Sequence, residues 1–233
     1  MIMLSIDSAG KSAAVAVTKE DVLLAERFEN SGLTHSQTLL PLIEQTLMDA
    51  KIVIDDVDLF AVTNGPGSFT GLRIGCALVK GMAGERPCIA VPTLAALSEN
   101  LPLVKNGYII PMMDARRAQV YTATFKVVDG KVERCKEDTA QSIESLQQEI
   151  ETLIKEGKAV WLVGDGAYLL KDTEGVQIPG GDDCLLKGQS VARAAKNIES
   201  VSAPCLGLRY LRLSQAEREK REREEKKNGS NRV

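Results

Sequence analysis

Histidine is almost missing from this chain of 233 residues, which contains only one, His35. A metal site built from two or three histidines therefore cannot be assembled from this chain alone. A Ser-His-Asp triad would have to use His35 as its base. The sequence thus offers little for metal-dependent or histidine-dependent hydrolysis.

Other scarcities exclude further classes of protein. The five cysteines are scattered, with no pair at metal-ligand spacing, which favours reduced thiols in a cytoplasmic protein. No apolar run approaches the roughly 20 residues of a membrane-spanning helix, and the N-terminus lacks the basic start of a signal peptide. The net charge of −3 makes the chain a poor candidate to bind RNA unaided, because such affinity depends on cations that neutralise phosphates.

The most informative stretch that is present runs from residue 64 to 73 and reads Asn-Gly-Pro-Gly-Ser-Phe-Thr-Gly-Leu-Arg. It lies between a strand-like run at 58–63 and a helix-like run at 70–83. Glycines in such a turn can aim backbone N–H groups at a phosphate. However, a P-loop would end in Gly-Lys-Ser/Thr, and a dinucleotide fingerprint would have a third glycine where Thr70 stands. The residues alone leave two interpretations open, a phosphate cradle and a structural turn.

Apolar periodicity predicts an α/β protein in which two halves repeat the same order of elements. In each half we expect hairpin strands, then a helix, then a further strand. The first half should contain a helix that begins at Thr34 with a capping-box sequence, and the second half a helix that Ser142 caps. The first strand of each half ends in an aspartate, Asp7 or Asp114, which indicates a weak internal duplication.

The same patterns predict three segments along the chain. We expect an N-terminal lobe at 1–104 and a reduced C-terminal lobe at 105–213. A charged helix or tail, partly disordered, should follow at 214–233, because residues 217–227 hold five acids and six bases.

Several motifs together point to a known family. They occur in the order Ile6-Asp7-Ser8, His35-Ser36, Leu40-Pro41-Leu42-Ile43, the run from Gly65 to Gly75, Val91-Pro92-Thr93-Leu94 and Asp114-Ala115-Arg116. Together they resemble the bacterial TsaB (YeaZ) family. The resemblance runs from residue 2 to about 125 and continues weakly through 164–166 and 210–212.

The resemblance implies a fold and a role. The fold is the actin-like ATPase (ASKHA, ribonuclease H-like) type, with two small lobes on mixed five-stranded sheets flanked by helices. The role is that of a non-catalytic scaffold that forms dimers when alone and supports the related TsaD protein, which carries the catalytic site. With the ATPase TsaE, that complex transfers a threonylcarbamoyl group to N6 of adenosine 37 in tRNA, which this chain would contact only indirectly.

The resemblance also bears on metal binding. The catalytic relative holds its metal with a pair of histidines that follow the stretch equivalent to 91–93. Residues 93–100 contain no histidine here, so we expect neither a metal site nor a catalytic residue.

A degenerate nucleotide site is expected at the two strand ends where actin-like proteins hold Mg²⁺ and phosphates. Its candidate residues are Asp7, Ser8, Gly10, Asp114 and Arg116. Because Arg116 and its neighbour replace glycines that would let phosphate approach, we expect weak binding of ATP or ADP with Mg²⁺ here, or binding at the junction with a partner. Asp7 and Asp114 could equally be aspartates that cap turns after strands.

A partner interface is expected on the helices at 34–49 and 70–83. Gly71 and Gly75 lie four residues apart on one helix face, which favours close packing of another helix, with 34–49 as the natural neighbour. The candidate interface residues are His35, Leu39, Leu42, Ile43, Gly71, Leu72, Ile74, Gly75 and Val79. The alternative is that both helices simply cover the sheet.

Two enzymatic functions are alternatives to the scaffold role. A stand-alone actin-like ATPase or kinase would need a second phosphate loop free of bulky side chains, and Arg116 argues against it. A metallopeptidase is opposed by the single histidine.

Overall fold

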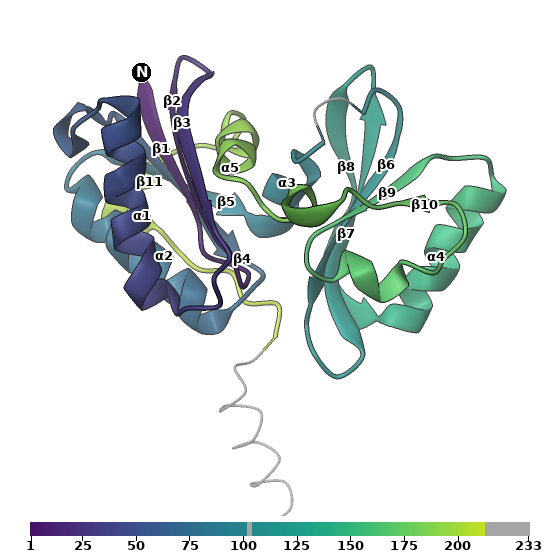
Figure 1. Ribbon diagram of the computed structural model, residues 1–233. Helices are drawn as coiled ribbons and strands as arrows, with labels where there is room; N and C mark the ends of the chain where they lie inside the picture. Colours follow the sequence, from purple (N-terminus) through teal and green to yellow (C-terminus); the bar gives the residue numbers. More distant parts are fainter. Residues whose placement is uncertain (102–103, 213–233) are drawn as a thin grey trace, which may run out of the picture.

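The computed structural model describes residues 1–101 and 104–212 and has two lobes (Figure 1). The first lobe is built on a sheet of order β11-β5-β4-β1-β2-β3 and the second on a sheet of order β10-β9-β6-β7-β8. The first sheet contains β1 (Ile2–Asp7), β2 (Ala13–Lys19), β3 (Val22–Glu29), β4 (Leu59–Gly65), β5 (Pro87–Pro92) and β11 (Val201–Ser202). The second contains β6 (Gly107–Asp114), β7 (Gln119–Val128), β8 (Lys131–Ser142), β9 (Val160–Val163) and β10 (Val176–Gln177). The predicted α/β class with two mixed sheets is confirmed, and the short β11 adds a sixth strand to the first.

The two sheets repeat one pattern of pairing. In the first, β1 pairs antiparallel with β2, β2 antiparallel with β3, and β1 parallel with β4. In the second, β6 pairs antiparallel with β7, β7 antiparallel with β8, and β6 parallel with β9. This matching topology confirms the internal duplication, and it places Asp7 and Asp114 at equivalent strand ends.

The helices form layers around the sheets (Figure 1). Helices α1 (His35–Ala50) and α2 (Phe69–Ala83) pack on one face of the first sheet, and α4 (Ile143–Lys155) packs on one face of the second. Helices α3 (Thr93–Ser98) and α5 (Gly188–Ala195) lie between the sheets, within the apolar cluster that joins the lobes. Four 3₁₀ turns complete the described elements: η1 (Ile54–Asp56), η2 (Ala167–Leu170), η3 (Gly181–Cys184) and η4 (Ala203–Cys205).

Side-chain caps fix the starts of two helices. Ser68 and Ser142 cap α2 and α4, because their hydroxyl oxygens accept hydrogen bonds from the N–H groups of Gly71 and Ser145. The capping box predicted at Thr34 is wrong: its hydroxyl donates to Oε1 of Gln37 at 2.8 Å instead of accepting a backbone N–H. Among the helices that the structure describes, none is long and apolar enough to cross a membrane.

The chain returns to the first lobe after completing the second sheet, which the sequence did not predict. Helix α5 packs on the first sheet, where the Ser5 hydroxyl donates to the carbonyl of Gly188 at 2.9 Å. Strand β11 then pairs with β5. The chain continues along the first lobe as residues 206–212, a segment that we call the strap. The division at residues 104 and 105 stays a prediction, and the predicted tail at 214–233 lies outside the described residues.

Candidate functional site between the lobes

Asp7 is buried at the end of β1, beneath residues 8–12, which form the first loop. Its Oδ1 accepts hydrogen bonds from the Thr63 hydroxyl at 2.7 Å and from the Ala9 N–H at 3.0 Å. Burial disfavours the charged carboxylate and raises the pKa of Asp7 from 3.8 to about 6, although these hydrogen bonds act in the opposite direction. The carboxyl group therefore ties β1 to β4 and shapes the first loop.

The glycines of α2 make room for this loop. A Cβ atom on Gly71 would lie 2.1 Å from the Ser8 carbonyl oxygen, and one on Gly75 would lie 2.3 Å from Ser8 Oγ. The Ser8 hydroxyl donates to the carbonyl of Gly71 at 2.9 Å. The expected helix–helix packing is thus corrected: the first loop covers both glycines, while α1 reaches only Gly71, through the ring of His35.

His35 supports the same loop. Its Nε2 lies 3.0 Å from the carbonyl oxygen of Gly10, at hydrogen-bonding distance. The side chain is partly buried at the start of α1, where it lines the cleft between the lobes.

The Gly-Pro-Gly turn is also packed against other parts of the chain. Gly65 and Gly67 have φ angles of 120° and 158°. A Cβ on Gly65 would lie 2.1 Å from the carbonyl oxygen of Arg209, and one on Gly67 would lie 2.5 Å from that of Ala9. The Ser68 N–H donates to the same Ala9 oxygen at 2.7 Å. These contacts favour the structural turn over the phosphate cradle.

The second strand-end loop, residues 115–118, differs from the first. Asp114 accepts a hydrogen bond from the Arg116 N–H at 2.7 Å, and its Oδ2 lies 3.3 Å from the guanidinium of the same residue. Arg116, Arg117 and Ala118 all have positive φ, at 63°, 55° and 54°, a region that favours glycine. Bulky residues therefore occupy a turn in which glycines would leave space for a ligand.

A cleft of about 730 Å³ separates the two loops. Besides Gly10, Asp114 and Arg116, it is lined by Lys11, Phe69, Tyr121, Asp165, Arg209, Tyr210 and Arg212. Asp165 accepts a hydrogen bond from the Asp114 N–H at 3.1 Å, and burial raises its pKa. A smaller cavity of about 130 Å³ adjoins the cleft and is lined in part by Asp7 and Asp165.

The residues at the two strand ends do not fit a magnesium–phosphate group in this arrangement. Asp7 is buried and accepts hydrogen bonds from the protein, whereas Asp114 is paired with a guanidinium that would compete with a cation. No group of three or more His, Cys, Asp or Glu side chains could hold a metal ion among residues 1–101 and 104–212. The cleft could accommodate a ligand, but these residues are arranged as structural contacts.

Most of the predicted interface residues lie in the core of the first lobe. Six are residues of α1 and α2 that are buried within the lobe, namely Leu39, Leu42, Ile43, Leu72, Gly75 and Val79. Gly71 is also buried, and His35 and Ile74 are partly exposed. The helices therefore use the buried side chains to cover the sheet, while contact of a partner with His35 and Ile74 stays a prediction.

Sequence reasoning missed four residues that shape the site. Thr63 holds Asp7, Asp165 holds the backbone of Asp114, and Arg209 and Tyr210 from the strap line the cleft. The runs at 164–166 and 210–212 carried a weak signal of resemblance, whereas Thr63 and Arg209 carried none.

Comparison with known families identifies relatives of the chain. The family model described as TsaD, tRNA N6-adenosine threonylcarbamoyltransferase, matches residues 29–206. A Bacillus subtilis (strain 168) protein named tRNA threonylcarbamoyladenosine biosynthesis protein TsaB is 30% identical over 225 residues, which cover 93% of this chain and 96% of the relative. The Escherichia coli (strain K12) protein of the same name is 30% identical over 199 residues, which cover 79% of this chain and 84% of the relative.

Solved structures share the fold. YeaZ from Pseudomonas aeruginosa superimposes with a TM-score of 0.72 at 23% identity, over 90% of this chain and 99% of that one. A protein from the same organism, described as uncharacterized with similarity to peptidase YEAZ, gives a TM-score of 0.75 at 22% identity, over 91% and 99%. The two-lobed α/β fold is thus the one that the sequence resemblance implied.

Proposed function

The chain belongs to the TsaB family of tRNA threonylcarbamoyladenosine biosynthesis proteins, and on that premise we propose that it is a non-catalytic subunit that binds a TsaD-like catalytic protein. In this proposal the chain serves the synthesis of threonylcarbamoyladenosine in tRNA as a scaffold in the cytoplasm. The partner performs the transfer, a TsaE-like ATPase joins the complex, and contact of this chain with tRNA is indirect.

The observation that carries the proposal is a row of exposed apolar side chains, one in the segment before α1 and two on α1 itself. Leu33, Leu40 and Met48 have 59%, 44% and 76% of their surface exposed. Leu33 lies in the segment just before α1. On the helix itself, Leu40 lies at the edge of the buried face and Met48 on the outer side, eight residues further along. Large apolar side chains exposed in this way are typical of protein-binding surfaces.

The nature of the partner follows from the relatedness of the two folds. The TsaD family model matches more than half of this chain, so a TsaD-like partner would present helices equivalent to α1 and α2. Two such surfaces can pair around a twofold axis, as in isologous dimers. The same row would support a homodimer when the partner is absent.

The contacts of the polar residues around the cleft support a scaffold role. The single histidine, His35, is hydrogen-bonded to the first loop, and Asp7 and Asp114 contact the protein's own groups. These residues act as structural supports, and the transfer reaction is assigned to the partner.

A substitution in the exposed row tests the proposal. Leu40→Glu should leave the fold intact but weaken binding to the same organism's TsaD-like protein by roughly tenfold or more, since central apolar contacts carry much of the binding energy. Light scattering after size exclusion and calorimetric titration would measure complex formation. The matched control is Leu169→Glu, because Leu169 is similarly exposed, at 47%, but lies in the second lobe.

Two outcomes would contradict the proposal. One is a native chain that does not bind the TsaD-like protein, and the other is a Leu40→Glu variant that binds as tightly as the control. The alternative, a stand-alone ATPase or kinase, rests on the 730 Å³ cleft and would require ATP turnover by the isolated chain. Weak binding of ATP or ADP with Mg²⁺, in the cleft or at the partner junction, stays a prediction. Calorimetric titration of the nucleotide into the protein would test it.

A further inference from the structure

The strap, residues 206–212, bridges the two lobes along the wall of the cleft. Four of its residues line that cleft: Arg209, Tyr210, Leu211 and Arg212. On the other side of the cleft the lobes are joined by the apolar cluster that contains α3 and α5. The strap therefore crosses the side on which the lobes could separate.

The strap is fastened to the first lobe through backbone and ring contacts. The Arg209 N–H donates to the Asn64 carbonyl at 2.7 Å, and the Asn64 side chain donates to the Gly207 carbonyl at 3.2 Å. The Tyr210 ring packs on Phe69 with centroids 4.8 Å apart, and its hydroxyl accepts a hydrogen bond from Arg73 at 3.1 Å. These contacts make the strap move with α2 and β4.

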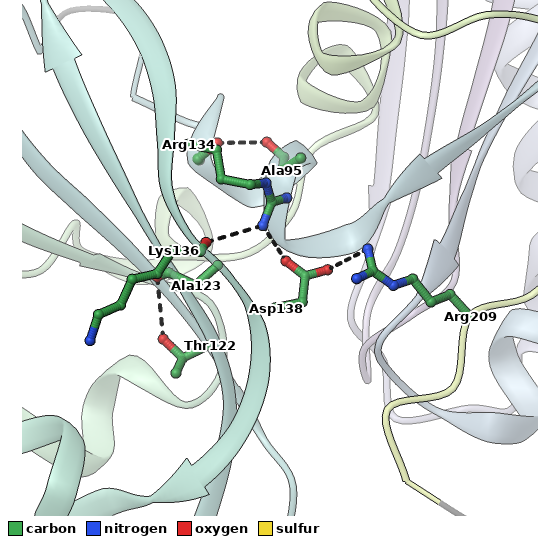
Figure 2. A network of polar contacts seen from close by, with 8 residues as sticks. Ala95, Thr122, Ala123, Arg134, Lys136, Asp138 and Arg209 are labelled. Carbon is green, nitrogen blue, oxygen red and sulfur yellow. Dashed lines mark hydrogen bonds and ion pairs between the residues drawn. The ribbon is translucent and has the colours of Figure 1, made fainter.

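Its contacts with the second lobe are fewer and are made by arginine side chains. Arg209 Nη1 lies 3.4 Å from Oδ2 of Asp138 on β8, and Arg212 Nη1 donates to the carbonyl of Ala115 at 3.1 Å. Figure 2 shows the Asp138 carboxylate between Arg209 on one side and Arg134 on the other.

Asp138 is an unusual anchor because its side chain is fully buried. Oδ1 is held by Arg134 at 2.5 Å, and the Arg134 guanidinium lies 4.6 Å above the Phe125 ring. Oδ2 accepts no hydrogen bond from the residues that the structure describes. The ion pair with Arg209 therefore provides the positive charge beside this oxygen. A buried carboxylate oxygen without a compensating charge is strongly unfavourable, so Asp138 should hold the strap in place.

We propose that the strap is a clasp that limits the separation of the two lobes, and that Asp138 is its latch. With Arg209 on Asp138, the wall of the cleft is complete and the lobes stay together. When this pair breaks, the second lobe pivots about the apolar cluster at α3 and α5, and the cleft widens. The inference concerns the isolated chain and does not depend on the proposed partner.

Distances between spin labels in the full chain test this inference. Nitroxides at Asp55→Cys in the first lobe and Gln148→Cys in the second would report lobe separation, after Cys135→Ser and Cys205→Ser remove the exposed native thiols. We expect Asp138→Asn, which removes the charge with little change of shape, to shift the distance distribution to longer and broader values. Arg209→Gln provides a second route, because it leaves Asp138 with Arg134 and removes only the strap's side of the pair.

The matched control is Asp49→Asn, which breaks the exposed 2.6 Å pair with Arg27 inside the first lobe. It should leave the distribution unchanged. The inference is overturned if neither Asp138→Asn nor Arg209→Gln lengthens the distances. It is also overturned if Asp49→Asn lengthens them as much, since the effect would then not belong to the latch.

Discussion

The aspartates that end the first strand of each lobe occupy equivalent places in the topology but opposite environments. Asp7 is buried, hydrogen-bonded to Thr63 and covered by a loop that packs into the glycines of α2. Asp114 borders the cleft and is paired with Arg116, a residue that is itself largely exposed. The duplicated fold thus keeps the position of the carboxylate in both lobes, while one has become part of the core and the other remains near solvent.

The largest expected difference between the two aspartates is that burial of Asp7 makes the free energy of unfolding depend on pH. Because the folded-state pKa of Asp7 is raised from 3.8 to about 6, the folded protein binds this proton more tightly than the unfolded chain. The resulting stabilisation is fully present below about pH 3.8 and is lost as pH rises through about 6. The loss should approach about 3 kcal/mol of the free energy of unfolding, at about 1.4 kcal/mol per pKa unit.

Asp7→Asn should abolish that part of the pH dependence, because the amide oxygen can still accept from Thr63 and Ala9 without a charge. Urea unfolding at several pH values between about 4 and 7 would measure the difference between the variant and the native protein. Asp114→Asn is the matched control and should retain the Asp7-dependent fall. An unchanged slope in Asp7→Asn would show that the two strand ends are not distinguished by burial in this way.

A second experiment tests how firmly the first loop is built into the lobe. Gly71→Ala places a methyl group 2.1 Å from the Ser8 carbonyl oxygen, so the backbone of the loop must move. We expect the free energy of unfolding to fall by about 1–3 kcal/mol, the usual cost of overpacking. Urea denaturation curves give this value directly.

Gly81→Ala on the same helix supplies the control, because a Cβ there meets nothing within 4 Å. It should raise the free energy of unfolding by up to about 1 kcal/mol, since alanine is the better helix former. If both substitutions stabilised the protein, the loop would not be packed on Gly71 as described.

The smallest effect is expected at the second loop. Arg116→Gln breaks the pair with Asp114, but the arginine is 72% exposed, so the free energy of unfolding should change by less than about 1 kcal/mol. Arg27→Gln, which breaks the exposed pair with Asp49, should have a similarly small effect. A loss at Arg116 as large as that of Gly71→Ala would mean that both loops are equally structural.

Local sequence patterns were enough to predict the elements that depend on neighbours in the chain. The apolar spacing of α1 and α4, the Ser142 cap and the Gly-Pro-Gly turn all act over a few residues. The repeated order of elements likewise predicted the equivalent strand ends at Asp7 and Asp114.

Contacts between distant segments could not be predicted in the same way. Periodicity indicates that Leu39, Leu42 and Ile43 share an apolar face, but it does not say whether a sheet or a partner covers that face. The burial of Asp138 is equally hidden, because charged residues precede it in the sequence and its partner Arg209 lies 71 positions along the chain, from 138 to 209. The position of α5 on the first sheet depends on packing around Gly188, where a Cβ would lie 2.6 Å from the Ala16 nitrogen.

The return of α5 and β11 to the first sheet has a consequence for synthesis of the protein. Ribosomes release the N-terminus first, so β1 to β5 emerge long before residues 188–202, which cover and extend that sheet. Until then, the Ser5 hydroxyl lacks its bond to Gly188, and one apolar face of the sheet lacks Val191, Ala192 and Ala195. The first lobe is therefore the first to be synthesised but among the last to complete its fold. Until residues 188–202 emerge, the uncovered apolar face of its sheet is at risk of aggregation.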